Sequence, residues 1–485
     1  MNNKSVNKNI FFSIILTSSN FIFPLITYTY VARVILPSGT GKVAFVTAVL
    51  SYFGYIAALG IPNYGIRETA IRRNNKNELS KFVQEILLIN LISTVISYIL
   101  LFSSIIFISK FHSYTNLFVI MGSSLFLQMI GVEWLYKGLE MYSYITYRSL
   151  FFKFISVCLT FLLIKDSSDY VMYGFLTIFT NSASNILNLV NLRKVITFKK
   201  YDNYNLKRHL SPIFIFFMST IIVSIYGQFD SLMLGFMKGD NTVGIYNAAL
   251  KIKSVVLSVS TAITSVFIPR MSFYYNKGSK LDFYNLIEKS VRISLFLLFP
   301  LSIFLMMNSK DAVLFVCGSE YLSAKSTLIV LMMCCLALAI TNIFGNQILI
   351  PKLDEKRYSE SVFISLFINL SLNLVLIPPL SSLGAAIATL ITEIFNIFWM
   401  GRGCKLEISQ IRKRVNFKIY LFPIIIVTSI TFPLFIYVEQ YSLILRLFIK
   451  GIVFFGFYYI LLYRNNEQIT RRIMSNLIDR IGGEK

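Results

Sequence analysis

Charged residues are scarce in this sequence. Only 14% of its 485 residues are Asp, Glu, Lys or Arg, whereas a soluble protein carries about 25%. Hydrophobic residues make up 55%, the mean hydropathy is +0.66, and the uncharged run 328–350 is long enough to cross a bilayer. The sequence therefore predicts a polytopic membrane protein and excludes a soluble globular fold.

Acidic residues are fewer still. The 23 Asp and Glu residues are outnumbered by 46 Lys and Arg residues, which gives a net charge of +23. In a membrane protein this excess indicates cytoplasmic loops and contact with anionic membrane lipids rather than with nucleic acid. If both termini are cytoplasmic, most of the Lys and Arg residues fall in cytoplasmic segments and only eight in outer ones, as the positive-inside rule requires.

The few histidine and cysteine residues do not predict a catalytic site, a metal site or a disulfide framework. Both histidines, His112 and His209, lie beside predicted loops, so we expect no histidine-based site. The five cysteines form no CxxC pair and are odd in number, which argues against a disulfide framework or a thiolate metal site. There is no Ser/His/Asp set, no paired carboxylates and no HExxH motif, so we expect no enzyme and no cofactor. A coupling ion, H⁺ or Na⁺, stays open.

The apolar segments predict an all-α protein of about fourteen transmembrane helices with both termini cytoplasmic. We expect two six-helix lobes, at 1–192 and 211–403, joined by a basic cytoplasmic linker at 193–210. Helices 13 and 14 and a cytoplasmic tail occupy 404–485. The first apolar stretch follows Lys4 and Lys8 without a small-residue cleavage site, which favours an uncleaved helix over a signal peptide.

Residues 37–42 (PSGTGK) resemble a phosphate-binding loop only superficially, because Leu36 stands where glycine is needed; they predict a tight turn between helices on the outer side.

A weak internal repeat supports two lobes. Residues 131–144 match residues 345–358 at Gly131/Gly345 and at three further positions. The same kind of alignment pairs Gly41 with Gly244 and Arg67 with Arg270. Because both six-helix units begin on the inside, the repeat predicts two parallel lobes about an axis along the membrane normal, as in many transporters.

The stretch 226–254 predicts a helical hairpin within the membrane, with its polar tip at 238–241. Asp230 and Lys251 lie at similar depths on its two arms, each about 15 Å from the tip. Charges at that depth are costly and mark candidate functional groups. Two interpretations stay open: Lys251 is a substrate-binding cation that Asp230 holds, or the two form a structural salt bridge.

Polar stripes follow several predicted helices. The eighth helix carries Asn247 and Lys251 on one face with Ser254, Ser258 and Thr261, whereas Lys253 faces away. The sixth carries Thr177, Asn181, Asn185 and Asn188, and the eleventh carries Asn369 and Asn373. Such stripes either line a hydrated cavity or hold helices together. We favour lining for the sixth helix, since amides suit sugar hydroxyls, and interhelical contact for the eleventh.

Other charges fall within or beside predicted helices. Glu133 and Lys137 are spaced to pair along one helix, so a structural role is favoured. Lys153 and Glu393 lack local partners in the sequence and are candidates to face a cavity. Arg33 lies at the end of the first helix and completes the candidate set.

Several stretches together resemble a known family. They are GTGKVAFVTAVLSYFGYIAALGIPNYGIRETA (39–70), EWLYKGLEMYSYITYRS (133–149), FDSLMLGFMKGDNTVGIYNAALK (229–251), VFIPRMSFYYNKGSK (266–280), GNQILIP (345–351) and NLVLIPPLSSLGAAIATLITE (373–393). In order and spacing they resemble the polysaccharide repeat-unit flippases of bacterial capsule and O-antigen synthesis, in the superfamily of multidrug extruders and the lipid II flippase. No motif in helices 13 and 14 adds to the resemblance.

The resemblance implies a multi-pass protein of the bacterial cytoplasmic membrane with a central cavity. It would pass an undecaprenyl-pyrophosphate-linked oligosaccharide from the inner to the outer leaflet by alternating access. A polysaccharide polymerase and a chain-length regulator would be further partners. The candidate substrate-binding residues are Lys251, Lys153, Asp230, Glu393, Asn181, Asn185, Asn247 and Arg33.

Alternative functions within the same superfamily stay open. A cation-coupled multidrug exporter predicts acidic residues in the cavity, and Glu393 and Asp230 favour it. A lipid II flippase shares fourteen helices and a basic cavity. A non-transporting membrane scaffold is disfavoured by the buried charges and polar stripes.

Overall fold

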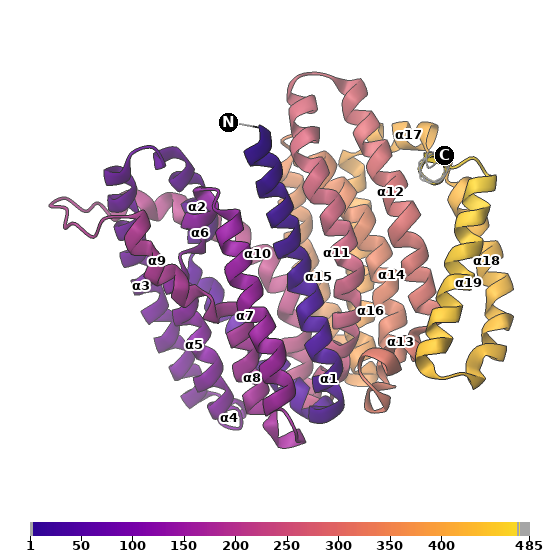
Figure 1. The fold of residues 1–485 in the computed structure, drawn as a ribbon, viewed down its shortest axis with the longest axis horizontal. Coiled ribbons are helices and arrows are strands. Elements are labelled where there is room, and N and C mark those ends of the chain that lie inside the picture. The colour runs from indigo at the N-terminus through magenta and orange to yellow at the C-terminus, as the bar shows by residue number, and fades with distance from the viewer. Residues whose placement is uncertain (1–2, 473–474, 476–485) are drawn as a thin grey trace, which may run out of the picture. The chain divides into compact units, whose positions relative to one another are not determined.

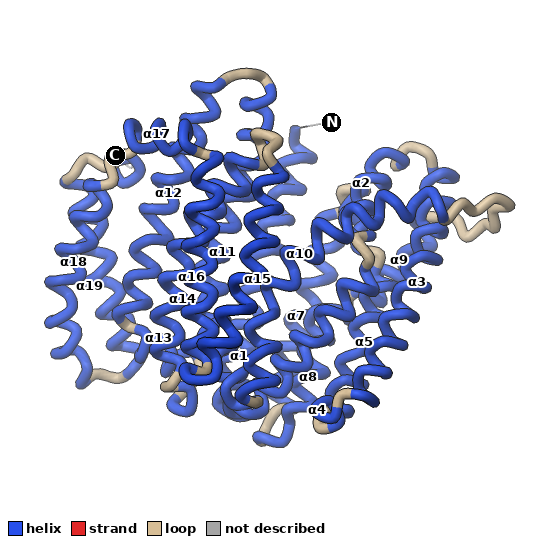
Figure 2. The backbone as a smooth tube through the Cα atoms, turned by 180° about the vertical axis from the view of Figure 1, so that it is seen from behind, coloured by secondary structure: helices blue, strands red, loops and turns tan. Residues whose placement is uncertain are grey.

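The computed structural model describes residues 3–472 and residue 475, with the backbone alone for residues 3–8, 10–11, 14, 219–226, 262–263 and 265–266. The end of the predicted cytoplasmic tail and the side chain of Tyr226 thus lie outside the described part. The described chain is almost wholly helical and contains no strand (Figure 2). It forms two compact units, Met1–Asn247 and Ala248–Lys485.

The N-terminal unit is built on long helices that run alongside one another (Figure 1). Helix α1 packs against α3, α5, α7, α8 and α10, so it is the central element of the unit. The helices are α1 (Asn3–Ala58), α2 (Ile61–Arg72), α3 (Lys76–Phe107), α4 (Ser109–His112), α5 (Thr115–Gly131), α6 (Glu133–Gly138), α7 (Tyr142–Leu163), α8 (Tyr170–Ile178), α9 (Asn185–Val195) and α10 (Lys207–Lys238), with a 3-10 turn η1 (Ser167–Asp169) and a π-helical turn η2 (Phe179–Ala183).

The C-terminal unit begins within α11 and is also a helical bundle. Helix α14 packs on α12 and α16, α15 packs on α16, and α18 pairs with α19. The helices are α11 (Asp240–Asn276), α12 (Lys280–Met307), α13 (Ser309–Val316), α14 (Ala324–Asn342), α15 (Glu355–Leu380), α16 (Ser382–Gly403), α17 (Lys405–Arg414), α18 (Lys418–Tyr437) and α19 (Leu443–Arg464), with 3-10 turns η3 (Ser319–Tyr321) and η5 (Val438–Gln440) and a π-helical turn η4 (Ile343–Leu349).

Eleven helical stretches in the described chain are long and apolar enough to cross a membrane. The longest, Ile15–Arg72, contains two of the predicted helices, because Leu36 leaves the helical region with φ 65° and ψ 172°. Proline disfavours helical geometry in the residue before it, and Pro37 follows Leu36. The break between the two predicted helices thus lies at Leu36, one residue before the turn predicted at 37–42, and residues 37–42 are helical. That this break lies on the outer side stays a prediction. The predicted helices 170–192 and 211–236 correspond to α8–η2–α9 and to α10.

The matched glycines of the weak repeat both lie at interruptions of a helix. Helix α5 ends at Gly131, and Val132 follows with a left-handed backbone. Gly345 lies inside the π-helical turn η4. A one-residue irregularity of this kind often marks a functional segment of a helix. The sequence match thus falls at two helix irregularities of different kinds, a helix end and a π-helical turn.

The last two helices are fixed to the C-terminal unit by a buried ion cluster. Asp311 of α13 contacts Arg446 at 2.6 Å and Lys450 at 2.8 Å, both on α19. Asp311 and Lys450 are almost completely buried. Tyr420 of α18 also donates to the buried Glu467 at 2.8 Å. Buried charges of this kind are stable only when paired.

Candidate substrate site

A polar cavity of about 390 Å³ lies in the N-terminal unit. Its walls come from α1, α2, α5 and the α8–η2 segment, with Phe217 of α10. Nine of the lining side chains carry a hydroxyl or an amide: Thr47, Ser51, Tyr55, Asn63, Ser124, Gln128, Thr177, Asn181 and Ser182. None of the lining residues that the structure describes is charged, so the cavity offers neutral hydrogen-bonding groups beside an equal number of residues without such groups.

The predicted stripe of the sixth helix divides at the π-helical turn η2. Thr177 and Asn181 line the cavity, as predicted for lining residues, and Asn181 is exposed there. Asn185 and Asn188 are buried elsewhere. Asn188 donates to the Gly131 carbonyl at 2.5 Å, so it holds α9 against the end of α5.

Two cations of α7 are buried on neutral oxygens. Lys153 is 2% exposed and donates to Ser19 Oγ at 2.7 Å and to Asn20 Oδ1 at 2.5 Å, both on α1. Arg148 donates to the Ser184 carbonyl at 2.7 Å and to Asn185 Oδ1 at 3.3 Å. Within the described residues, neither cation has a carboxylate within ion-pair distance. Their positive charge is therefore not neutralised by a direct contact.

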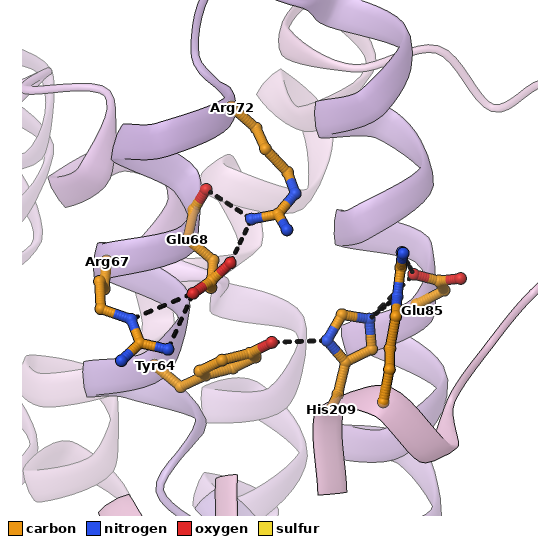
Figure 3. Close-up of polar contacts among 7 residues, drawn as sticks. Tyr64, Arg67, Glu68, Arg72, Glu85 and His209 are labelled. Carbon is orange, nitrogen blue, oxygen red and sulfur yellow. Dashed lines mark hydrogen bonds and ion pairs between the residues drawn. The ribbon is translucent and has the colours of Figure 1, made fainter. Parts of the chain in front are cut away.

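A polar cluster braces α2, whose first turn forms part of the cavity wall. Tyr64 of α2 lies 2.6 Å from Nδ1 of His209, and Nε2 of His209 lies 2.9 Å from the Glu85 carboxylate (Figure 3). Glu85 also pairs with Arg208. Both His209 and Glu85 are buried. The cluster thus holds α2 against α3 and the start of α10, which gives His209 a structural contact. The expectation that no histidine forms a functional site stays a prediction.

A second pair of contacts neutralises Glu68 on the same helix. Its carboxylate accepts from Arg67 at 2.8 Å and is also paired with Arg72 (Figure 3). Gly60 precedes α2 with φ 74°, and a Cβ there would meet the backbone at Phe217. Only glycine combines this left-handed backbone with so close an approach. Together these contacts fix α2 against α10 at one end of the cavity.

The hairpin tip packs on α1 and on the segment around α4. Gly41 and Gly244 meet without side chains between them, since a Cβ on Gly41 would meet the backbone at Asp240 and Gly244. Tyr114 donates to Asp240 Oδ1 at 2.5 Å, and Lys110 donates to the Gly235 carbonyl. These contacts close the end of the unit that we predict to be outer.

The candidate residues of the hairpin have local partners. Asp230 accepts from Tyr246 at 2.6 Å, and Asn247 donates to Ser231 Oγ at 3.2 Å. Lys251 is half-buried in α11, whereas Lys253 is 9% exposed. Asp230 and Lys251 belong to different compact units, so their pairing stays a prediction.

The remaining sequence candidates are dispersed. Arg33 is exposed and donates to the Thr29 carbonyl of its own helix. Glu393 of α16 is 3% exposed and accepts from Thr341 at 3.2 Å. Lys153, Asn185 and Arg33 do not line the polar cavity. Of the candidate residues, only Asn181 does so.

One predicted pair is confirmed, because Glu133 and Lys137 form a salt bridge at 2.8 Å. Asn369 and Asn373 are buried, and Asn373 donates to Asn369 at 3.0 Å within helix α15. The interhelical contact predicted for these two asparagines stays a prediction. Among the described residues, no group of three or more His, Cys, Asp or Glu side chains is placed to hold a metal ion.

Sequence reasoning missed most of the cavity wall. Thr47, Ser51 and Tyr55 recur every four residues on α1, and Ser124 and Gln128 do so on α5. That spacing is the signal that could have found them, because residues four apart share one face of a helix. Arg148 was missed because it lies at a predicted helix boundary.

The fold and the polar cavity define a multi-pass, all-helical membrane protein. The chain belongs to the polysaccharide biosynthesis protein family, which it matches over residues 6–274. Residues 216–378 also match the MatE family. The resemblance drawn from the sequence is thereby confirmed at the level of the family.

Relatives with transporter names resemble this chain over most of its length, and two solved structures share its fold. A protein named as an O-antigen transporter in Escherichia coli (strain K12) is 24% identical over 81% of this chain and 95% of its own length. Another of that name in Shigella dysenteriae is 25% identical over 82% of this chain and its full length. A lipid II flippase in an inward closed conformation has a TM-score of 0.69 at 18% identity, covering 94% of this chain and 99% of its own. A multidrug resistance transporter of the MATE family has a TM-score of 0.58 at 16% identity, covering 81% and 95%.

Proposed function

We propose that this protein is a flippase that moves a lipid-linked oligosaccharide across the membrane. The observation that carries the proposal is the polar cavity within the membrane bundle of a polysaccharide biosynthesis protein. Neutral hydroxyl and amide groups match sugar hydroxyls, since each can donate and accept hydrogen bonds. The full-length similarity to proteins named as O-antigen transporters supports the same function.

The cargo that fits best is an undecaprenyl-pyrophosphate-linked repeat unit. Its glycan would occupy the polar cavity, and its diphosphate would be attracted by cations within the bundle. Lys153 of the N-terminal unit is buried on neutral oxygens, and Lys251 of α11, which is half-buried, is the candidate on the hairpin. A diphosphate offers more charge than the neutral oxygens that Lys153 contacts and would compete well for its ammonium.

The transport cycle that we propose is alternating access. The glycine contact between Gly41 and Gly244 closes the predicted outer end of the N-terminal unit, and it would open to release the cargo into the outer leaflet. The protein would work in the bacterial cytoplasmic membrane as a transporter rather than an enzyme. A polymerase and a chain-length regulator as partners stay a prediction.

Deletion of the gene followed by lipid analysis tests this function. We expect an undecaprenyl-pyrophosphate-linked oligosaccharide to accumulate on the cytoplasmic side, and a plasmid copy of the gene to clear it. Accumulation of lipid II would instead assign the alternative lipid II function. An unchanged lipid profile with increased sensitivity to cationic drugs would assign the multidrug function, for which buried Glu393 is the coupling candidate.

A further inference from the structure

The C-terminal unit carries an apolar groove of about 360 Å³ that the proposed transport function does not use. Its walls come from α12, α14 and α17, together with the start of η4. Nearly all of its lining is apolar, and the residues that matter here are Leu298, Phe299, Leu336, Ile340, Ile408 and Ile411. A groove of this size accommodates about one fatty acyl chain and is far smaller than a polyprenyl tail.

One charged side chain, Arg412, lies among these apolar residues. It is exposed at the last turn of α17 and, among the described residues, contacts no carboxylate. Two basic residues nearby contact carboxylates, whereas the adjacent Lys413 is exposed and does not line the groove. Arg414 lies 3.7 Å from Glu288, and Lys352 lies 3.0 Å from Glu407. Arg412 is thus the charged group of the groove that remains available to an anion.

Helix α17 has the composition of a helix that lies at a membrane surface. Its sequence is KLEISQIRKR, with Ile408 and Ile411 toward the groove and three basic residues in its last turn. Basic residues on such helices attract anionic lipids of the cytoplasmic leaflet. By the charge distribution of the sequence, α17 lies on the cytoplasmic side.

We propose that this groove binds one anionic phospholipid of the inner leaflet. One acyl chain lies between α12, α14 and α17, and the phosphate contacts the Arg412 guanidinium. The single cation matches the single negative charge of a phosphatidylglycerol headgroup. The bound lipid holds α17 against α12 and α14, and this site is separate from the polar cavity of the N-terminal unit.

Native mass spectrometry of the purified full-length protein tests the site. The protein is incubated with phosphatidylglycerol or, as the neutral probe, with phosphatidylcholine. We expect wild-type protein to retain one phosphatidylglycerol molecule with roughly fivefold preference over phosphatidylcholine, the factor that one basic residue near a membrane surface supplies. Arg412→Ala should lose that preference. Lys413→Ala removes an adjacent exposed charge that does not line the groove and should behave as wild type.

A second variant tests the acyl chain independently of the charge. Ala339 lines the groove, so Ala339→Phe should fill it and abolish retention of the lipid. Met333→Phe, on an exposed face of the same helix outside the groove, is the size-matched control. Thermal unfolding with and without phosphatidylglycerol verifies that each variant is folded.

Three results would overturn the proposal. One is equal retention of phosphatidylglycerol by wild type and Arg412→Ala. Another is equal retention of the two phospholipids by wild type. The third is displacement of phosphatidylglycerol from the groove by undecaprenyl phosphate, which would make the groove part of the cargo site. None of these outcomes depends on whether the protein transports a glycan.

Discussion

The N-terminal unit contains a cavity of about 390 Å³ in which nine of the eighteen described lining residues carry a hydroxyl or an amide, whereas the C-terminal unit has a groove of about 360 Å³ with an almost wholly apolar lining. The two differ in chemistry and not in size. A lipid-linked glycan and its surrounding lipids present the same two chemistries, a polar head and apolar chains. We propose that the cavity of the N-terminal unit binds the polar head and that the groove of the C-terminal unit binds a lipid chain.

Buried cations of the two units can be compared in the same way, although buried Lys253 of the C-terminal unit contacts no carboxylate among the described residues. In the C-terminal unit Lys450 and Arg446 contact the Asp311 carboxylate. In the N-terminal unit Lys153 and Arg148 contact hydroxyl, amide and carbonyl oxygens. A cation neutralised by a carboxylate stabilises the fold, whereas a cation on neutral oxygens still attracts an anion. The variants below test this division.

The largest effect on stability is expected at Asp311. Asp311→Asn leaves two cations of α19 without their carboxylate, and breaking a buried pair costs about 3–5 kcal/mol. The free energy of unfolding in an SDS titration should fall by that amount. Glu320→Gln, at an exposed carboxylate in the turn η3 that follows α13, should leave it unchanged. A loss below about 1 kcal/mol for Asp311→Asn would mean that the ion cluster does not fix α19.

Replacement of Lys153 should have a small effect on stability and a large effect on export, the reverse of Asp311→Asn. Lys153→Met removes a charge whose partners are neutral, so the free energy of unfolding should fall by only about 1 kcal/mol. Export of the lipid-linked glycan should fall at least roughly tenfold, because one lost charge-assisted contact is worth more than 1.4 kcal/mol. Lys165→Met, at the exposed end of α7, is the control. Normal export by Lys153→Met at matched protein level would indicate that Lys153 has only a structural role.

The glycine contact at the hairpin tip tests whether the N-terminal unit must close at its predicted outer end. Gly41→Val places side-chain atoms against the backbone at Asp240, and overpacking of this kind costs about 1–3 kcal/mol. We expect outward-accessible cysteine labelling near the tip to increase and export to fall. Gly456→Val, where a Cβ meets no atom within 4 Å, should change neither. Unchanged labelling in Gly41→Val would argue against a moving contact.

Much of the fold could be predicted from the sequence. Hydropathy locates the spans, and Pro37 explains the break at Leu36. The match of Gly131 with Gly345 marks two helix interruptions. These features are local, so composition and spacing specify them. The cluster of Glu85 and His209 could not be predicted, since it joins residues more than a hundred positions apart.

The candidate site was predicted only in part, and the π-helical turn η2 explains one failure. The stripe of the sixth helix assumes a regular α-helix, in which Thr177, Asn181, Asn185 and Asn188 share a face. A π-helical turn adds one residue, which rotates everything after it by about 100°. Thr177 and Asn181 therefore face the cavity, whereas Asn185 and Asn188 pack against neighbouring helices. No pattern in the sequence predicts that extra residue.

The smallest expected effects are those of two asparagine variants. They distinguish Asn181, which lines the cavity, from Asn188, which packs between helices. Asn181→Ala removes an exposed amide from the cavity wall, so the free energy of unfolding should change by less than about 0.5 kcal/mol. Export should fall roughly three- to tenfold, the value of one hydrogen bond to the glycan. Asn188→Ala leaves the Gly131 carbonyl without its 2.5 Å donor and should lower the free energy of unfolding by about 1–3 kcal/mol. At matched protein level its export should remain normal. If instead both variants lost export equally, the polar cavity would not be the place where the glycan is recognised. The difference in polarity between the cavity and the apolar groove would then have no role in transport.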